Sequence, residues 1–367
     1  MGDPHGIGII GTGNISRAYF STLKNIGDAR IVAVADLDRE RTQAAAAETG
    51  AVALTPDALV ADPRVGTVVN LTIPAAHAEI ALLAIAHGKD VYGEKPLAAT
   101  LDEARAVLAA AAAAGVRVGS APDTVLGTGI QSARAAVDSG LIGRATSGTA
   151  TWVSAGHESW HPHPDFYYRE GGGPLFDMGP YYLTSLVQVL GPIVSVSGAS
   201  SRAHAERTIG SGPRAGERIP VEVDTHVTGL LEHASGAISN ITMSFDAVRT
   251  SAAPLEIHGE SGSLTLPDPN VFDGHTQLWR TQRGEPDVLP YSAGYLDAGR
   301  GVGLLEFIRS GSAEARASGA LGFHVLEVMH GILEAARSGE RRAIGSTVER
   351  PALVPLTAAA DWRVAQG

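Results

Sequence analysis

Residues 11–16 read Gly-Thr-Gly-Asn-Ile-Ser and follow a short apolar run that begins at Gly6. An apolar strand that leads into a Gly-x-Gly turn and then a helix is typical of proteins that bind a dinucleotide pyrophosphate. Gly11 permits the tight turn, and Gly13 lets backbone N–H groups approach phosphates at the positive end of the helix. Ser16 stands where a third glycine is usual. We therefore expect the dinucleotide to contact Gly11, Thr12, Gly13, Asn14 and Ile15.

Asp36 ends the second apolar run, where dinucleotide-binding folds place an acidic residue for the ribose hydroxyls. Its carboxylate would repel a 2′-phosphate, so the sequence predicts NAD as the cofactor, with NADP disfavoured. Arg39 and Arg41 lie close by in the sequence, and their positive charges could still allow NADP to bind. The alternative role for Asp36 is to cap a helix, a position that aspartate favours.

Two later segments each follow an apolar run that we expect to be a strand. They would therefore lie at the carboxyl edge of the parallel sheet, where ligands bind in open α/β folds. In the segment 70–77 we expect Thr72, Pro74 and His77 to line the cofactor, although His77 could instead cap the next helix. The segment 93–96 has the sequence Gly-Glu-Lys-Pro, and we expect Glu94 and Lys95 to contact the cofactor as well.

Lys95 is one of only three lysines among 28 basic residues. A lysine ammonium is a compact charge whose pKa shifts readily on burial, whereas arginine stays protonated. A lysine at this sheet edge therefore suggests a role for an ammonium in chemistry or in cofactor binding. The alternative is a surface lysine that follows a strand.

In the second half of the chain, Gly171, Gly172 and Gly173 precede the sequence Pro-Leu-Phe-Asp-Met-Gly-Pro-Tyr. A glycine run followed by proline favours a helix start, and Asp177 and Tyr181 would then share one helix face. Pro180 predicts a kink, or a later helix start near Gly179. Taken alone, Asp177 is typical of a cap and Tyr181 of a core aromatic residue.

These residues must be positioned by two different kinds of domain. Within residues 1–121, β-branched runs alternate with alanine-rich helical patterns, which predicts a Rossmann domain: an α/β, doubly wound parallel sheet. The expected strands lie near 6–10, 31–35, 67–71, 90–92 and 117–119, and the expected helices near 15–25, 39–49, 77–87 and 101–114.

The pattern of residues 122–367 predicts an α+β domain with a large, mostly antiparallel open sheet and helices on one face. The alternating runs are 145–153, 223–231, 237–245 and 255–259, and the helical patterns are 130–139, 173–190, 303–310 and 321–337. Residues 200–220 are expected to form a long hairpin or an excursion from the sheet, and not a linker.

Composition excludes several classes of function. The net charge of −11 disfavours nucleic-acid binding, and the absence of cysteine excludes disulfides and thiolate metal sites. No apolar stretch is long enough to span a membrane, so we expect a cytoplasmic protein without a membrane partner. His157 and His161 are four residues apart but have no clear carboxylate partner in the sequence, so we predict no metal site.

Three motifs in this order resemble the Gfo/Idh/MocA oxidoreductases, a family named for glucose-fructose oxidoreductase and inositol dehydrogenase. They are the Gly11-x-Gly13 turn, the Glu94-Lys95-Pro96 segment and the Gly171-Gly-Gly-x-x-x-Asp177-x-Gly179 segment. The likeness covers almost the whole chain. It implies an N-terminal Rossmann domain, a C-terminal domain whose open sheet serves in a homodimer or homotetramer, and a site between the two domains.

The resemblance also implies hydride transfer between nicotinamide and a secondary alcohol or ketone of a sugar, sugar derivative or cyclitol. Many members carry an acid/base histidine at the position of Tyr181, so this chain looks more like the glucose-fructose oxidoreductase and dihydrodiol dehydrogenase branches, which have tyrosine there. A phenol is a poor base at neutral pH, so Tyr181 would need a nearby cation such as Lys95. Lys95 could instead transfer the proton itself, while Asp177 orients the substrate or Lys95.

We expect the substrate to be contacted by Asp177, Tyr181 and a set of aromatic and basic residues between 152 and 169, which are His157, Trp160, His161, Tyr168 and Arg169. Two alternatives remain open. The chain could be a glycosidase or a sugar-to-sugar hydride exchanger that retains its NAD, or a non-catalytic NAD-binding regulator.

Overall fold

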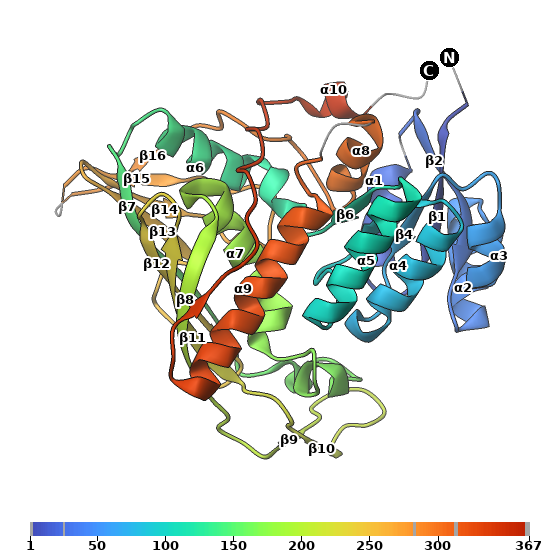
Figure 1. The fold of residues 1–367 in the computed structure, drawn as a ribbon, viewed down its shortest axis with the longest axis horizontal. Coiled ribbons are helices and arrows are strands. Elements are labelled where there is room, and N and C mark those ends of the chain that lie inside the picture. Colours follow the sequence, from blue (N-terminus) through green and yellow to red (C-terminus); the bar gives the residue numbers. More distant parts are fainter. Residues whose placement is uncertain (1–2, 25, 282–283, 312–314, 364–367) are drawn as a thin grey trace. The chain divides into compact units, whose positions relative to one another are not determined.

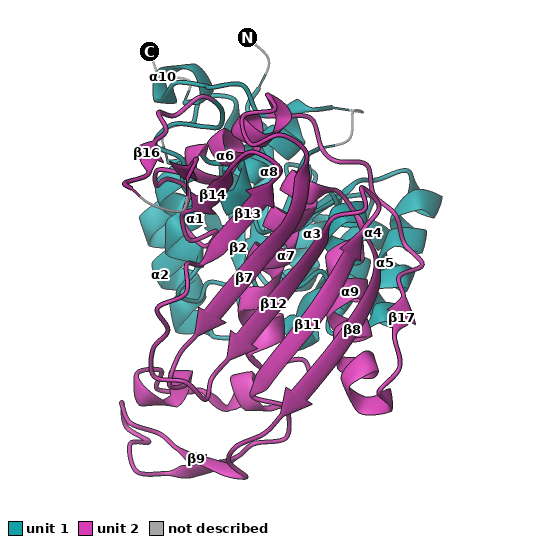
Figure 2. Cartoon of the chain, turned by 90° about the vertical axis from the view of Figure 1, so that its left-hand side faces the viewer, with its two compact units in different colours: residues 1–127, 293–323, 354–367 teal, residues 128–292, 324–353 magenta. Residues whose placement is uncertain are grey.

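The structure is a computed structural model that describes residues 3–24, 26–281, 284–311 and 315–363. The chain divides into two compact units, coloured teal and magenta in Figure 2. The first unit comprises residues 1–127, 293–323 and 354–367, and the second comprises residues 128–292 and 324–353. Within the described residues, no helix is long and apolar enough to cross a membrane.

A six-stranded parallel sheet with strand order β3-β2-β1-β4-β5-β6 forms the centre of the first unit. This strand order and the alternating helices confirm the doubly wound fold. The strands are β1 (His5–Ile10), β2 (Ala29–Ala35), β3 (Val52–Ala53), β4 (Thr67–Asn70), β5 (Asp90–Gly93) and β6 (Val118–Ser120). The helices are α1 (Ser16–Leu23), α2 (Arg39–Thr49), α3 (Pro56–Ala61), α4 (His77–Ala86), α5 (Leu101–Ala114), α8 (Val302–Arg309) and α10 (Ala359–Trp362).

Local sequence signals set the helix ends in this unit. The Asp38 side chain caps α2 by accepting hydrogen bonds from the N–H groups of Glu40 and Arg41. Helix α5 begins with a capping box of Thr100 and Glu103 and ends at Gly115, which has a left-handed backbone. The sequence analysis missed the two-residue strand β3 and the short helix α3, which are too brief to show a periodic pattern.

The first unit includes later segments that the sequence division at residue 121 assigned to the second domain. The backbone N–H of Ser120 at the end of β6 donates to the carbonyl oxygen of Ala317. The buried carboxylate of Asp123 accepts hydrogen bonds from the N–H groups of Gly301 and Gly303, at 2.7 and 3.1 Å. Residues 293–323 therefore complete the first unit, although they are far away in the sequence.

The second unit is built on a nine-stranded sheet with strand order β16-β15-β14-β13-β7-β12-β11-β8-β17. Its long strands are β7 (Ala145–Val153), β8 (Ile193–Ser201), β11 (His226–His233), β12 (Ile238–Ser244) and β13 (Leu255–Gly259). The shorter strands are β14 (Ser263–Leu266), β15 (Gln277–Trp279), β16 (Asp287–Val288) and β17 (Arg342–Ala343). The expected antiparallel pairing holds for all neighbours except β7 and β12, which run parallel, so the sheet is mixed.

The helices of this unit are α6 (Thr128–Asp138), α7 (Pro174–Leu190) and α9 (Gly319–Ser338), of which α9 begins in the first unit. Helix α7 packs on β7, β11 and β12 (Figure 1). It begins at Pro174 and continues through Pro180 to Leu190, so the later start near Gly179 that Pro180 suggested does not occur.

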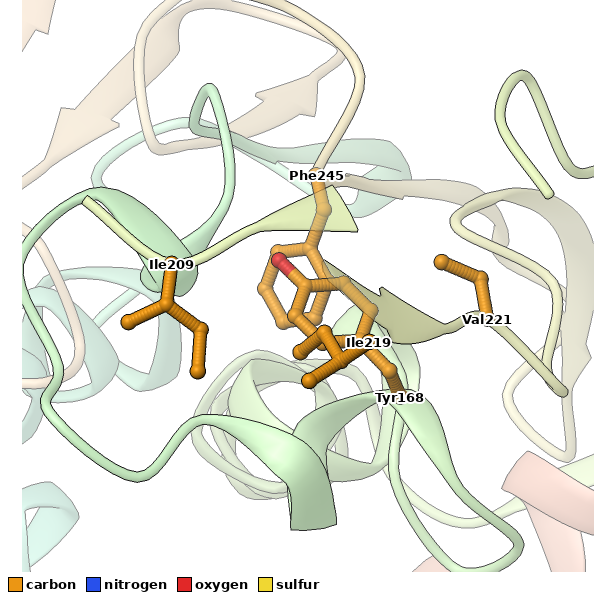
Figure 3. Packing of buried hydrophobic residues seen from close by; sticks show 5 residues of the cluster. All are labelled: Tyr168, Ile209, Ile219, Val221 and Phe245. Carbon is orange, nitrogen blue, oxygen red and sulfur yellow. The ribbon is translucent and has the colours of Figure 1, made fainter. Parts of the chain in front are cut away.

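The predicted hairpin in residues 200–220 is confirmed as β9 (Glu206–Thr208) and β10 (Arg218–Pro220), which pair antiparallel. The hairpin contributes Ile209 and Ile219 to a small buried cluster, which also contains Tyr168, Val221 and Phe245 (Figure 3). This cluster fixes the segment before α7 to the hairpin.

Candidate active site

The glycine turn after β1 has the geometry that the sequence predicts. Gly11 has a φ of 98°, and a Cβ atom on this residue would lie 2.5 Å from the backbone carbon of Leu71. Only glycine fits there. A Cβ atom on Gly13 would meet nothing within 4 Å, so there is open space on this side of the turn. That open space, next to the N-terminus of α1, fits a pyrophosphate.

Asp36 is joined to this turn at the end of β2. Its Oδ2 accepts hydrogen bonds from the N–H of Thr12 at 2.7 Å and from the Thr12 hydroxyl at 3.1 Å. Its Oδ1 accepts from the N–H of Asp38 at 2.9 Å, and Asp38, not Asp36, caps α2. The structure thus brings Asp36 next to the predicted phosphate turn, which is the arrangement that ribose recognition needs.

His77 links the two other predicted loops of the first unit. Its Nδ1 lies 2.6 Å from the carbonyl oxygen of Pro96, and its Nε2 lies 3.0 Å from that of Thr72. The side chain is buried, and burial lowers the pKa of the imidazole. Because both ring nitrogens face protein carbonyls, neither is left for a cofactor, and His77 instead ties the loop after β4 to the loop after β5. Pro74 lies between Thr72 and His77 in the sequence, and it is half-buried.

Glu94 is buried, and the next residue, Lys95, is half-buried. Glu94 has a hydrogen-bond partner, Tyr19, that the sequence did not indicate. The Tyr19 hydroxyl donates to Oε1 of Glu94 at 2.9 Å, while Oε2 accepts from the N–H of Lys95 at 3.2 Å. Burial, reinforced by Glu94, raises the pKa of Tyr19 well above its usual value, so Tyr19 remains a donor. Sequence spacing gives no signal for this pair, since Tyr19 and Glu94 lie on different crossover units.

In the second unit the structure brings His157 and Asp177 together. Nε2 of His157 lies 2.7 Å from Oδ2 of Asp177, in the first turn of α7. The carboxylate partner that the sequence did not reveal for His157 is therefore Asp177. Tyr181 lies one turn further along α7 and is buried. In the described part of the chain, no three His, Asp or Glu side chains gather in a way that could hold a metal ion.

The other residues predicted to contact substrate have different environments. Trp160 is 57% exposed, and its ring centroid lies 5.1 Å from that of His157 and 5.4 Å from that of His161. Arg169 is exposed. Tyr168 has no exposed surface, and its hydroxyl donates to Glu158, so this ring belongs to the buried cluster and offers no surface to a substrate (Figure 3).

Comparison with known proteins gives two family matches. Residues 5–121 match the family description "Oxidoreductase family, NAD-binding Rossmann fold", and residues 130–265 match "GFO/IDH/MocA C-terminal domain". Among curated relatives, 1,5-anhydro-D-fructose reductase of Ensifer adhaerens is 28% identical over 265 residues, which are 70% of this chain and 74% of the relative. Levoglucosan dehydrogenase of Pseudarthrobacter phenanthrenivorans is 27% identical over 57% of each chain.

Among solved structures, an NAD-binding oxidoreductase from Klebsiella pneumoniae superposes with a TM-score of 0.80. It is 23% identical, and the match covers 94% of this chain and 99% of the other, so it supports the fold. The two family matches lie in chain order, over the glycine turn, Asp36 and the Glu94-Lys95-Pro96 segment and then over the segment that holds Asp177 and Tyr181. This chain therefore belongs to the GFO/IDH/MocA family of NAD-binding oxidoreductases.

Proposed function

We propose that the protein is an NAD-dependent dehydrogenase or reductase that acts on a secondary alcohol or ketone of a sugar, sugar derivative or cyclitol. The observation that carries the proposal is the open face of the glycine turn at Gly13, with Asp36 bound to Thr12 beside it. When bound there, the nicotinamide cofactor supplies the hydride acceptor or donor. The protein then has to bind the polyol, orient it and move one proton.

We assign the proton transfer to Tyr181, which is buried on α7, and we also assign a role in catalysis to Lys95, whose ammonium lies just after β5. Asp177 orients the substrate, and its place one helical turn before Tyr181 supports this role. The exposed ring of Trp160, close to His157 and His161, supports a contact with the apolar C–H face of a sugar or cyclitol ring. Arg169 is exposed on the same segment and would bind substrate hydroxyls.

Asp36 supports NAD as the preferred cofactor. Its carboxylate already accepts hydrogen bonds from Thr12 and Asp38, so it is held at the end of β2 with its negative charge in place. A 2′-phosphate at this position would meet like charge. The Arg41 guanidinium pairs with Asp38 at 3.3 Å, so part of its positive charge is already offset by that carboxylate.

We also propose a homodimer or homotetramer formed through the open face of the nine-stranded sheet. Leu230 on β11 and Ile238 on β12 are 48% and 49% exposed, whereas their neighbours Leu231 and Ile241 are fully buried. Strand register and burial place Leu230, Glu232, Ile238 and Asn240 on one face, opposite the face that carries Leu231 and Ile241. The double variant Leu230→Glu with Ile238→Glu should be monomeric in light scattering. A wild-type monomer would contradict this proposal.

The test of the activity is a panel of levoglucosan, 1,5-anhydro-D-fructose, free monosaccharides and cyclitols, incubated with NAD or NADH. We expect at least one member to reduce NAD or to oxidise NADH, with NADP or NADPH a poorer cofactor. The purified protein should first be examined for bound cofactor. Firmly bound NAD together with glycoside cleavage, but without net change in free NAD, would contradict the proposal in favour of a glycosidase that retains its cofactor.

A further inference from the structure

The pair of His157 and Asp177 joins two segments that are 20 residues apart in the sequence. The two side chains are nearly buried, with exposed fractions of 10% and 15%. An ionised carboxylate only accepts hydrogen bonds, so Nε2 of His157 must carry the hydrogen that points at Oδ2 of Asp177. The bond is short, at 2.7 Å, as expected when the acceptor is charged.

Four aromatic rings surround the imidazole of His157. Their centroids lie at 4.5 Å for Tyr167, 4.8 Å for Phe245, 5.1 Å for Trp160 and 5.8 Å for Trp152. Nδ1 of His157 is buried within this cage and has no hydrogen-bond partner among the described residues. The cage restricts rotation of the ring, and a second hydrogen at Nδ1 would be unpaired there. The ring is therefore held in one orientation, with Nε2 directed at Asp177.

The backbone of His157 is also fixed, by the residues on either side of it. Gly156 has a φ of 100°, and a Cβ atom there would lie 2.2 Å from Oε2 of Glu158, so glycine is required. Glu158 accepts hydrogen bonds from the Tyr168 hydroxyl and, at 3.0 Å, from Arg207. Arg207 in turn pairs with Asp246 beyond the end of β12. This buried network fixes the segment to the hairpin and the sheet.

We propose that His157 is a positioning residue, which sets the orientation of the Asp177 carboxylate and thereby the binding of the reacting alcohol or ketone. The inference rests on the proposed function, in which Asp177 orients the substrate. Aromatic packing alone does not require a histidine at position 157. The direct bond to Asp177 is what the imidazole adds, and it acts one helical turn before Tyr181.

Two variants separate the hydrogen bond from the packing. His157→Phe keeps an aromatic ring in the cage but removes the donor to Asp177. His157→Gln removes the ring but can present an amide N–H close to the position of Nε2. We expect His157→Phe to lower kcat by roughly tenfold or more, and His157→Gln to recover most of that loss. The KM for NAD should stay the same in both variants.

The measurements are steady-state kinetics with the panel substrate that the wild-type protein turns over, NADH binding by fluorescence, and thermal melting. If His157→Phe does not fold, His157→Met provides the same loss of the donor with a side chain that adapts to the cage. A histidine that only packs would predict the reverse order, with Phe active and Gln impaired in proportion to its lower Tm. That result would overturn the proposal while leaving the dehydrogenase assignment intact.

Failure of the proposed function has a different signature. If the wild-type protein binds NADH but turns over no member of the panel, the dehydrogenase assignment fails, and the positioning role falls with it. A wild-type enzyme that is active, with His157→Phe unchanged in kcat, rejects the positioning role alone.

Discussion

Nδ1 of His77 and the carbonyl oxygen of Pro96 lie 2.6 Å apart, while the other ring nitrogen of His77 faces the carbonyl oxygen of Thr72. One buried side chain thus connects the loop after β4 with the loop that carries Lys95. His77→Phe would fill the same space but remove the ring N–H that one of these buried carbonyl oxygens accepts. We expect the free energy of unfolding to fall by about 1–3 kcal/mol in urea titrations.

His87 provides the control for this variant. It lies at the end of the same helix, α4, where it is exposed and its Nδ1 lies 2.9 Å from the carbonyl oxygen of Leu83. His87→Phe should change stability by less than about 0.5 kcal/mol. Equal stabilities for the two variants would show that His77 does not hold the loops together.

A methyl group added at Gly11 should lower the stability of the protein, whereas one added at Gly13 should lower its affinity for NADH. Gly11→Ala strains a left-handed backbone and places Cβ against the Leu71 backbone, so we expect it to lose stability by about 1–3 kcal/mol or more. Gly13→Ala has open space for its Cβ atom and should melt like the wild-type protein. Because the new methyl group would occupy the phosphate approach, NADH affinity should fall roughly tenfold.

Fluorescence titration with NADH, combined with thermal melting, separates these two outcomes. A Gly13→Ala protein with unchanged NADH affinity would show that the cofactor does not lie on this side of the turn.

Cofactor preference should depend on the carboxylate of Asp36. Asp36→Ser removes the charge that opposes a 2′-phosphate, so the ratio of NADP to NAD efficiency should rise by roughly tenfold or more. Thr12→Val is the matched control, because it removes one hydrogen bond to Asp36 but keeps the carboxylate. The ratio of kcat/KM values for the two cofactors is the measurement. A similar shift in both variants would mean that the loop conformation, and not the charge, sets the preference.

Asp123 should make stability depend on pH. Its carboxyl group is fully buried, and this burial raises its pKa from 3.8 to about 6. Between these two values the folded protein holds a proton that the unfolded chain has released, so the free energy of unfolding falls as pH rises through the window. The total fall would be about 3 kcal/mol, with no further change from this group above pH of about 6.

Asp123→Asn removes the titrating group but keeps an acceptor for the N–H groups of Gly301 and Gly303. Chemical denaturation of both proteins across this pH window gives the difference between them, in which the contributions of other groups cancel. Parallel pH profiles for the two proteins would refute the role of Asp123.

The sequence was most informative where a pattern is local. Helix α2 and strands β7 and β13 have the predicted bounds. Helix α2 lies between the capping residue Asp38 and the left-handed Gly50, and the strands have an alternating side-chain pattern, so these signals act over a few positions. The glycine turn and Asp36 were also predictable, since a strand, a turn and a helix in succession leave little choice of geometry. Strand β12 was located correctly, but its parallel pairing with β7 depends on residues far apart in the chain.

The missed features are long-range contacts. Tyr19 reaches Glu94 across 75 positions, and Asp123 reaches Gly301 across 178. Neither pair has a spacing that signals contact, because a buried hydrogen bond is set by how whole elements pack. The pair of His157 and Asp177 was missed for the same reason, although each residue was singled out on its own.

The central claim is tested most directly by the near-ultraviolet absorbance of reduced nicotinamide, followed with the polyol panel in the wild-type protein and in Lys95→Met and Tyr181→Phe. The account predicts NADH formation from at least one polyol by the wild-type protein, and near loss of that rate in both variants with NADH binding retained. A wild-type protein that binds NAD and NADH, yet neither reduces NAD with any polyol nor oxidises NADH with any ketone, would contradict the account and favour a regulatory role. Full activity in either variant would remove that residue from the chemistry.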